Sequence, residues 1–265
     1  MAGGAELRPA RVYRNGSATA PTVVFFHGGG WVAGDLETHD RQVRNLAIET
    51  GAVVVSVDYR RPPETRFPGA FKDAFAAVRD VVGRIKEFGG DVARIGVAGD
   101  SSGGNLAAAS AIACREAGIK LAGQMLVYPV TDALGNFADP AENARFPSRA
   151  ENGEGYGLSL PVTEWFCAHY VKDRAQGADW RVSPLRAKDF RGLAPAVVAT
   201  AWFDLLRDEG VAYANALRDA GVPTVHHDGQ GLIHGYFGLG DSSDTARTEA
   251  QRVRTDFRAM PERGS

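Results

Sequence analysis

The sequence predicts an α/β fold in which a mostly parallel central sheet is flanked by helices. Apolar runs of strand length alternate with segments of helical periodicity along the 265 residues, and this alternation is typical of a parallel sheet covered on both faces. Two of the runs lead directly into glycine-rich stretches, at His27 and at Gly99. The predicted strands are 10–14, 22–26, 52–57, 94–98, 123–128, 195–200 and 222–227.

The predicted helices connect these strands and are indicated by apolar residues that recur at helical spacing. The first has an apolar face that runs from Phe71 to Ile85. The second is rich in alanine, and such small side chains would let it pack closely beneath the turn that precedes it. The third ends at Gly221, a residue suited to a helix C-cap. The second helix is expected at Asn105–Ala117, the third at Glu209–Ala220 and a fourth at about 243–258.

Composition and charge describe an ordinary globular chain, which we expect to form a single domain over residues 1–265. The chain is 44% hydrophobic and 23% charged, with a formal net charge of −2 and no basic stripe, so no nucleic-acid partner is expected. Its two cysteines, Cys114 and Cys167, lie in apolar helical patterns that indicate core positions and no disulfide framework. No apolar run approaches the roughly 18 residues needed to span a bilayer, and residues 1–14 lack the apolar core of a signal peptide. We therefore expect a cytoplasmic protein without a membrane span.

One segment, 131–161, interrupts the alternation of strands and helices. It is polar, contains several glycines and prolines, and shows no strong periodicity. We expect it to form an irregular excursion over one edge of the sheet. Because it is rich in glycine and polar residues, it should be mobile and only partly apolar. Its expected role is that of a residual cap or lid.

The stretch Gly99–Gly104 contains the pattern G-x-S-x-G of a nucleophile elbow. Such an elbow is a sharp turn from strand to helix that lifts a serine hydroxyl clear of the sheet. The turn strains the serine backbone, and only small neighbours such as Gly99 and Gly103 leave room for it. Ser101 is therefore the candidate nucleophile. Asp100 lies too close to it in sequence to act as its acid partner, and we expect it to support the turn through local hydrogen bonds.

The stretch His27–Trp31 follows an earlier strand and has the pattern of a glycine loop that supplies backbone N–H groups to an oxyanion hole. We expect donors from Gly28 and Gly29, together with the backbone N–H of Ser102 just after the nucleophile. Glycine suits this loop because a side chain would block close approach of the backbone to a substrate. A phosphate-binding loop is not indicated, since no Gly-Lys-Ser/Thr ending follows. His27 is expected to hold the loop by hydrogen bonds. A nucleophile and an oxyanion hole at strand ends indicate acyl transfer.

A serine nucleophile needs a general base, and His234 is the best candidate among the six histidines. It follows the last predicted strand, in a loop flanked by glycines. His39 and His169 fall in helical stretches that we expect to be exposed. The adjacent pair His226 and His227 is interpreted as structural in preference to metal-binding, because neighbouring strand residues point to opposite faces. No metal or other cofactor is expected.

The carboxylate that orients this base should follow the strand before it. Asp204 lies just beyond the predicted strand 195–200, in the chain order Ser, Asp, His of the α/β-hydrolases. A carboxylate at this place would fix the tautomer of His234 and stabilise the imidazolium that forms during attack. Asp208 and Glu209 are alternatives, but they open the following helix and are interpreted as charges that favour its dipole.

Six short segments carry a resemblance to a known family: His27-Gly28-Gly29-Gly30-Trp31, Val57-Asp58-Tyr59-Arg60 with Pro63-Glu64, Gly99-Asp100-Ser101-Ser102-Gly103-Gly104-Asn105, Tyr128-Pro129, Phe203-Asp204-Leu205-Leu206-Arg207-Asp208-Glu209, and Ile233-His234-Gly235. With them the chain resembles the hormone-sensitive-lipase family of α/β-hydrolases, in its bacterial esterase branch with the GDSxGG motif. The resemblance runs from about Arg11 to about Phe257. It implies an α/β-hydrolase fold with Ser101, Asp204 and His234 as a catalytic triad. It also implies cofactor-free hydrolysis of small carboxylic esters, usually with short acyl chains, through an acyl-enzyme.

The sequence departs from the pattern of that family at places that bear on the site. Ser102 stands where alanine is usual, a change that its backbone donor should tolerate, and Leu205 replaces a usual proline, which would loosen the loop that holds Asp204. Relatives carry a longer N-terminal segment that forms part of a cap. We therefore expect a reduced cap, in which 131–161 provides the only substantial cover of an unusually open site. Apolar surface left uncovered in this way would favour association with a partner or with a second copy as a homodimer.

Two other functions stay open on the sequence. An amidase or deacetylase would use the same triad, because the two reactions share the tetrahedral intermediate and differ mainly in protonation of the leaving group. A catalytically inactive binding protein is the second, since the plant gibberellin receptors resemble this family but have lost the catalytic histidine. The presence of His234 argues against the second function.

Overall fold

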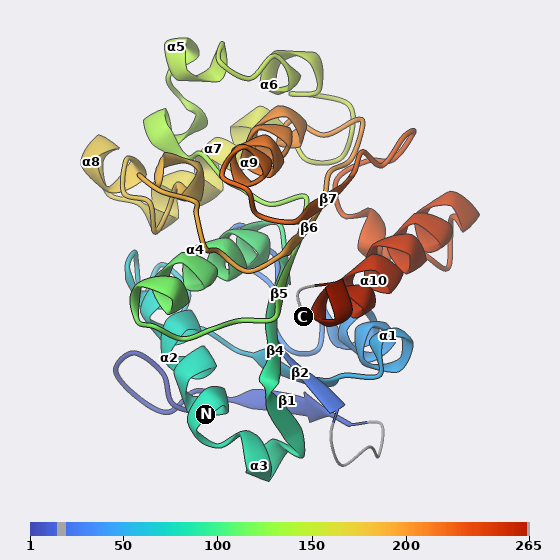
Figure 1. Cartoon of the computed structure of the whole chain (residues 1–265). Coiled ribbons are helices and arrows are strands. Elements are labelled where there is room, and N and C mark those ends of the chain that lie inside the picture. The colour runs from blue at the N-terminus through green and yellow to red at the C-terminus, as the bar shows by residue number, and fades with distance from the viewer. Residues whose placement is uncertain (15–19, 264–265) are drawn as a thin grey trace.

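The computed structural model describes residues 1–14 and 20–263, in which seven strands form one sheet between two layers of helices (Figure 1). The strand order is β1-β3-β2-β4-β5-β6-β7. β1 pairs antiparallel with β3, and every other neighbouring pair is parallel. The strands are β1 (Ala10–Tyr13), β2 (Ala20–Phe26), β3 (Val53–Val57), β4 (Gly90–Asp100), β5 (Gly123–Val127), β6 (Ala196–Ala199) and β7 (Thr224–His227).

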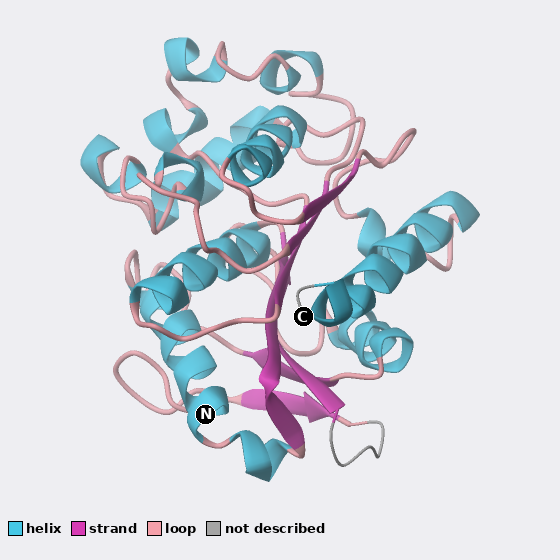
Figure 2. Cartoon of the chain, viewed as in Figure 1, coloured by secondary structure: helices cyan, strands magenta, loops and turns pink. Residues whose placement is uncertain are grey.

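Helices cover both faces of this sheet, as Figure 2 shows. One face carries α1 (Asp40–Thr50) and α10 (Asp244–Arg263). The other carries α2 (Gly69–Gly83), α4 (Ser102–Glu116) and α9 (Arg207–Asp219), and the short α3 (Ile85–Phe88) follows α2. This arrangement of a mostly parallel sheet between helices confirms the predicted fold class.

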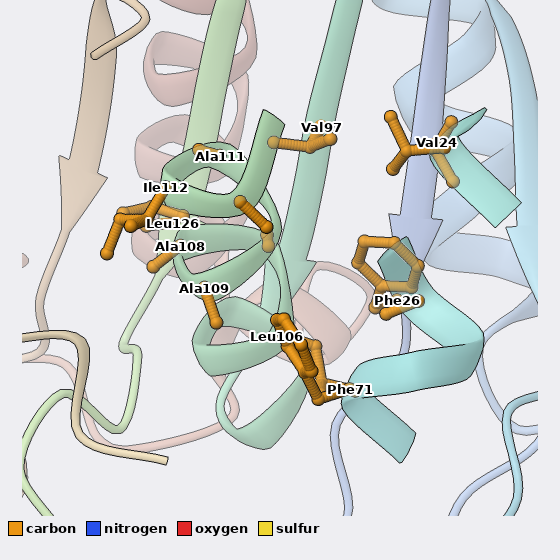
Figure 3. Close-up of a cluster of buried hydrophobic side chains, with 14 of the residues drawn as sticks. Val24, Phe26, Phe71, Val97, Leu106, Ala108, Ala109, Ala111, Ile112 and Leu126 are labelled. Carbon is orange, nitrogen blue, oxygen red and sulfur yellow. The ribbon is translucent and has the colours of Figure 1, made fainter. Parts of the chain in front are cut away.

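The larger hydrophobic cluster lies between the sheet and the layer of α2 and α4 (Figure 3). In β2, Val24 and Phe26 belong to this cluster, whereas Val23 and Phe25 belong to the cluster on the opposite face. Burial on both faces explains why this strand is a continuous apolar run in the sequence. The alanine-rich helix predicted from the sequence is α4, and its residues 107–109 are fully buried within the larger cluster. The expected close packing beneath the turn is confirmed.

Some elements differ from the sequence prediction. β4 begins at Gly90, earlier than the predicted residue 94, because a register shift in β2 lets Ala20 pair with Gly90. The helical stretches expected around His39 and His169 correspond to α1 and α7 (Leu160–Tyr170). His39 is the N-cap residue of α1, but only 12% of its side chain is exposed. The expectation that His39 is exposed is therefore wrong.

The long connection between β5 and β6 lies in the upper part of Figure 1. Segment 131–161 is less irregular than expected, because short helices occur within it, and the packing of one of them buries Arg149 to 1% exposure. Helices of three or four residues are too short to give a periodic sequence signal. The connection comprises η1 (Leu134–Phe137), α5 (Pro140–Asn143), α6 (Ser148–Glu151), α7, α8 (Arg174–Gly177) and η2 (Pro184–Arg186).

Cys114 and Cys167 are both buried and carry free thiols, as their apolar surroundings in the sequence predicted. Burial raises the pKa of each thiol to about 12, so neither is a reactive thiolate near neutral pH. Among the described helices, none is both long enough and apolar enough to cross a membrane.

Candidate active site

Ser101 lies in a strained turn between β4 and α4. Its backbone angles are φ 55° and ψ −121°, and a positive φ is uncommon for any residue other than glycine. The turn also requires its glycines: a Cβ on Gly99 would collide with the carbonyl oxygen of Gly103, and a Cβ on Gly103 would collide with that of Phe26. The backbone therefore has the geometry expected of a nucleophile elbow.

Three side chains from distant parts of the sequence form one chain of hydrogen bonds. The Nε2 atom of His234 lies 3.1 Å from Oγ of Ser101, and its Nδ1 atom lies 2.7 Å from Oδ2 of Asp204. The other carboxylate oxygen of Asp204 accepts the backbone N–H of Leu206 at 2.9 Å, which fixes the direction of the carboxylate. The structure thus brings together the three residues that the sequence singled out.

The loops that carry Asp204 and His234 lie side by side after β6 and β7. Phe203 and Ile233 form a parallel bridge between them. The ring of His234 also packs against that of Tyr128, with 4.5 Å between the ring centroids. These contacts hold the imidazole between the carboxylate and the serine hydroxyl.

The electrostatics of His234 favour its protonated form. Burial disfavours the imidazolium, but the nearby carboxylate of Asp204 outweighs burial and raises the pKa of His234 above its ordinary value. An imidazole with a raised pKa is a stronger base for the proton of a serine hydroxyl. This arrangement can therefore activate Ser101 for attack on a carbonyl carbon.

The glycine loop approaches the elbow, but not with all the donors that the sequence predicted. The backbone N–H of Gly28 donates to Oδ1 of Asp100 at 2.9 Å, so a partner within the protein already occupies it. Gly29 and Gly30 instead line the cavity beside the nucleophile. Ser102 is the first residue of α4, where backbone N–H groups have no partner inside the helix. The structure thus differs from the prediction at Gly28, and Gly30 becomes the candidate donor in its place.

Asp100 connects the elbow to the glycine loop and faces His39. It is 5% exposed, and its Oδ1 lies 3.4 Å from Nε2 of His39. Burial favours the neutral acid, but the positive charge on His39 and the N–H of Gly28 together lower the pKa of Asp100. The pKa of His39 is raised in return, because the carboxylate outweighs its burial. The expectation of purely local hydrogen bonds at Asp100 is therefore corrected.

His27 holds the glycine loop, as the sequence predicted. Its Nδ1 atom lies 2.9 Å from the carbonyl oxygen of Gly28, and its ring stacks on Tyr59 with 4.3 Å between centroids. The hydroxyl of Tyr59 in turn donates to the carbonyl oxygen of His27 at 2.8 Å. Burial lowers the pKa of His27 to about 4. The ring is therefore neutral at neutral pH, and its Nδ1–H can donate to Gly28.

The other histidines that competed for the role of base have structural partners. The Nε2 atom of His226 lies 3.0 Å from the hydroxyl of Thr200. His227 lies between Glu249 and Asp256, with 3.0 Å from one of its ring nitrogens to each carboxylate. Among the side chains that the structure describes, no three of His, Cys, Asp or Glu gather in a way that could hold a metal ion.

The alternative acids also have other partners. Both Asp208 and Glu209 lie in the first turn of α9, as predicted. The Oδ2 atom of Asp208 accepts the backbone N–H of Ser148 at 2.7 Å. Glu209 is fully buried and pairs with the guanidinium of Arg149. Its interpretation as a charge that only favours the helix dipole is therefore incomplete, because it also binds the connection between β5 and β6.

A cavity of about 280 Å³ opens beside Ser101. The serine itself lines this cavity and is 8% exposed. Part of the cavity wall comes from Leu158, but Thr163 and Phe166 of α7 also line it. The expectation that 131–161 provides the only substantial cover is therefore corrected, whereas the openness of the site stays a prediction. His39 adds a polar group to the same wall.

Three residues at this site were not identified from the sequence. Gly30 belongs to the glycine-rich stretch His27–Trp31, so the sequence did contain a signal for it. His39 and Phe166 carried no such signal. His39 lines the cavity from the N-cap of α1, and Phe166 lines it from the interior of α7. Their place depends on how these helices pack and not on a local motif.

With this geometry established, comparison with known proteins identifies the family. The family described as alpha/beta hydrolase fold matches residues 23–238. The chain is 41% identical over 223 residues to esterase LipI of Mycobacterium tuberculosis, covering 83% of this chain and 67% of that protein. It is 36% identical over 244 residues to ethyl acetate hydrolase of Pseudomonas putida, covering 90% and 74%. It spans between 61% and 67% of the length of three mycobacterial esterases that it matches.

A solved structure gives the same result. The carboxylesterase EstE1, cloned from a metagenomic library, is 40% identical and superposes with a TM-score of 0.88 over 95% of this chain and 84% of that one. Fold and site together define an α/β-hydrolase. The chain belongs to the α/β-hydrolase fold family, in the group related to hormone-sensitive lipase, as its sequence motifs implied.

Proposed function

We propose that this protein is a carboxylesterase that hydrolyses esters of short acyl chains through an acyl-enzyme on Ser101. The observation that carries the proposal is the continuous hydrogen-bonded chain from Ser101 through His234 to Asp204, beside the backbone N–H groups of the glycine loop. The esterase activity named for relatives at about 40% identity supports it.

The geometry supplies each step of ester hydrolysis. His234 takes the proton of the Ser101 hydroxyl as Oγ attacks the ester carbonyl carbon, and Asp204 stabilises the imidazolium. The backbone N–H groups of Gly29, Gly30 and Ser102 receive the oxyanion, each worth on the order of 3 kcal/mol of transition-state stabilisation. The intermediate collapses when His234 gives its proton to the departing alcohol. A water molecule then attacks the acyl-enzyme with His234 again as base, which releases the carboxylic acid and free Ser101.

The preference for short acyl chains follows from the size and lining of the site. A cavity of about 280 Å³ lies at the lower end of the volumes typical of small-molecule sites, roughly 300–1,000 Å³. Trp31, Val130 and Leu206 give it an apolar wall, which suits a small acyl group. The printed name of the Pseudomonas relative, ethyl acetate hydrolase, agrees with a small substrate.

A matched series of substrates tests this proposal against the amidase or deacetylase that shares its triad. We expect hydrolysis of p-nitrophenyl esters, with kcat/KM highest at short acyl lengths and falling as the chain outgrows the cavity. The corresponding anilides should react far more slowly, because nothing in the geometry favours protonation of an amine leaving group over an alkoxide. Faster turnover of the anilides would instead establish the amidase.

The pH dependence of activity should follow the protonation of His234. Because its raised pKa keeps the base protonated at lower pH, kcat/KM should be low in acid and rise as the pH passes that pKa. The midpoint is expected above the ordinary histidine value of about 6.5. A profile of kcat/KM from pH 5 to 9 on one short ester measures it. A midpoint well below 6.5 would contradict the charge arrangement.

Asp204→Asn should separate the two candidate acids. An asparagine keeps the shape of the side chain but favours the wrong imidazole tautomer, so kcat should fall by on the order of 10³–10⁴ with little loss of fold. Asp208→Asn is the matched control, since its amide oxygen can still accept the N–H of Ser148, and it should keep most of the activity. Circular dichroism would check that both variants are folded. A larger loss of kcat in Asp208→Asn than in Asp204→Asn would show that Asp208, and not Asp204, is the acid that orients His234.

We also propose which residues cover the active site. Residues 131–161 together with α7 would form the residual cap over a single α/β domain, supported by the contacts of Leu158 and Phe166 with the cavity. Closing such a site excludes water from the acyl group. The homodimer and the cytoplasmic location stay predictions.

A further inference from the structure

The loop that carries Asp204 runs from Thr200 to Leu206, between β6 and α9, and is called the acid loop here. A segment of the connection between β5 and β6, residues 148–152, lies along it. This segment consists of α6 and Asn152 and is called the splint. The hydrogen bonds between splint and acid loop join residues that are 50 or more positions apart in sequence.

Two splint side chains bind three backbone carbonyl groups of the acid loop. The hydroxyl of Ser148 donates to the carbonyl oxygen of Leu205 at 2.9 Å. The amide nitrogen of Asn152 lies 3.3 Å from the carbonyl oxygen of Asp204 and 3.4 Å from that of Trp202. Ser148 is fully buried and Asn152 is 4% exposed, so water does not compete for these bonds.

The splint also binds the start of α9, immediately after the acid loop. The backbone N–H of Ser148 donates to Oδ2 of Asp208 at 2.7 Å, and the N–H of Asp208 donates back to the Ser148 hydroxyl at 3.1 Å. Arg207 donates to Glu151 at 2.7 Å and to the carbonyl oxygen of Trp202 at 3.1 Å. The acid loop is therefore held at both its middle and its end.

A buried ion pair fixes the splint itself to the body of the protein. The side chains of Arg149 and Glu209 are 1% and 0% exposed, and the guanidinium lies over the rings of Phe137 and Phe146. Burial raises the pKa of Glu209 to about 7, although the guanidinium acts in the opposite direction. Loss of one partner of such a pair leaves an uncompensated buried charge and is strongly destabilising. The pair therefore anchors the splint, but it is unsuited to a test of function.

We propose that Ser148 and Asn152 are positioning residues that set the distance between Asp204 and His234. The connection that contributes to the cover of the site would thus also align the acid, Asp204, so that cap and acid loop move together. The proposal rests on the proposed function only for its effect on rate. Its physical basis is that a displacement of about 1 Å in a catalytic group can slow a reaction by roughly 100-fold.

A purely structural role for the splint predicts a different result. Loss of stability alone lowers the fraction of folded protein but leaves the pKa of His234 unchanged in the molecules that stay folded. A displaced Asp204, in contrast, lowers the pKa of His234, because the carboxylate that raises it has moved away. The pH profile of activity therefore distinguishes alignment from stability.

The test compares the double variant Ser148→Ala/Asn152→Ala with the control Asp139→Ala. Asp139 belongs to the same connection. Its side chain caps α5 by accepting the N–H of Ala141, and it pairs with Arg174. Neither of these partners belongs to the acid loop. We measure kcat and KM on one short p-nitrophenyl ester, the midpoint of kcat/KM against pH, and the proton NMR signal of the His234 Nδ1–H that Asp204 accepts. Thermal unfolding of each variant gives the folded fraction.

The double variant is expected to lower kcat by about 10- to 100-fold with little change in KM. Its pH midpoint should fall by roughly half a unit or more, and the downfield Nδ1–H signal should shift or broaden, whereas Asp139→Ala changes none of these. An unchanged midpoint and NMR signal in the folded double variant would overturn the proposal, as would equal effects in Asp139→Ala. The NMR signal does not depend on catalysis, so failure of the ester-hydrolase function would appear separately, as a parent protein that keeps the NMR signal but does not hydrolyse the ester.

Discussion

Ser101→Ala is expected to abolish ester hydrolysis, with kcat lower by roughly 10³–10⁶-fold. The variant removes the Oγ atom that lies 3.1 Å from Nε2 of His234, and with it the nucleophile on which the acyl-enzyme is proposed to form. Steady-state rates on a short p-nitrophenyl ester measure the loss. The residual rate should come from the oxyanion donors and from substrate binding alone.

The fold of this variant should stay intact, because the strain of the elbow resides in its backbone and alanine tolerates the same angles about as well as serine. Ser102→Ala is the matched control. Its hydroxyl lies one residue away, but the proposed donor at this position is the backbone N–H, so activity should be largely retained. Near-normal activity of Ser101→Ala would refute the assignment of the nucleophile.

His234→Ala is expected to be almost as inactive, with kcat lower by on the order of 10⁴–10⁶-fold. Without the imidazole nothing takes the proton from Ser101, and Asp204 is left buried with its Oδ2 facing an empty space. Because nucleophile and base act as a unit, the double variant Ser101→Ala/His234→Ala should be no slower than either single variant. The same ester assay, applied to all three variants, tests this lack of additivity.

The adjacent histidine pair provides the controls for His234. His226→Ala removes only the contact with Thr200, so its kcat should stay close to that of the parent. His227→Ala breaks the contacts with Glu249 and Asp256 of α10, which should lower the unfolding temperature but not the kcat of the folded protein. If an alanine at 226 or 227 removed activity while His234→Ala kept it, the base would be misassigned.

The sequence predicted those parts of the molecule that depend on local patterns. β2 and β4 were recognisable because burial on both faces makes a strand continuously apolar. Ser101, Asp204 and His234 were recognisable because the family places each in a loop after a strand, and the parallel sheet collects such loops at one edge. The position of each motif after a predicted strand and the order of the motifs along the chain were therefore enough to single out the three residues that the structure brings together.

The sequence could not predict features that depend on contacts between distant segments. Gly28 was chosen as a donor because it is a glycine in the right loop, yet its N–H is occupied by Asp100, 72 residues further along the chain. The splint was missed because α6 has only four residues and its partners lie in the acid loop. His39 was expected to be exposed because its pairing with Asp100 exists only after α1 packs beside the elbow.

Covalent trapping tests whether hydrolysis proceeds through an acyl-enzyme on Ser101. The protein is treated with a short p-nitrophenyl phosphonate ester. Oγ of a serine nucleophile attacks its phosphorus and expels p-nitrophenolate, which leaves a stable adduct. Intact mass and peptide mapping are followed together with the loss of esterase activity. We predict one adduct per chain, located on Ser101, formed in proportion to the lost activity and absent from Ser101→Ala. Inactivation with the adduct on another residue, or complete modification of Ser101 without loss of activity, would contradict the claim.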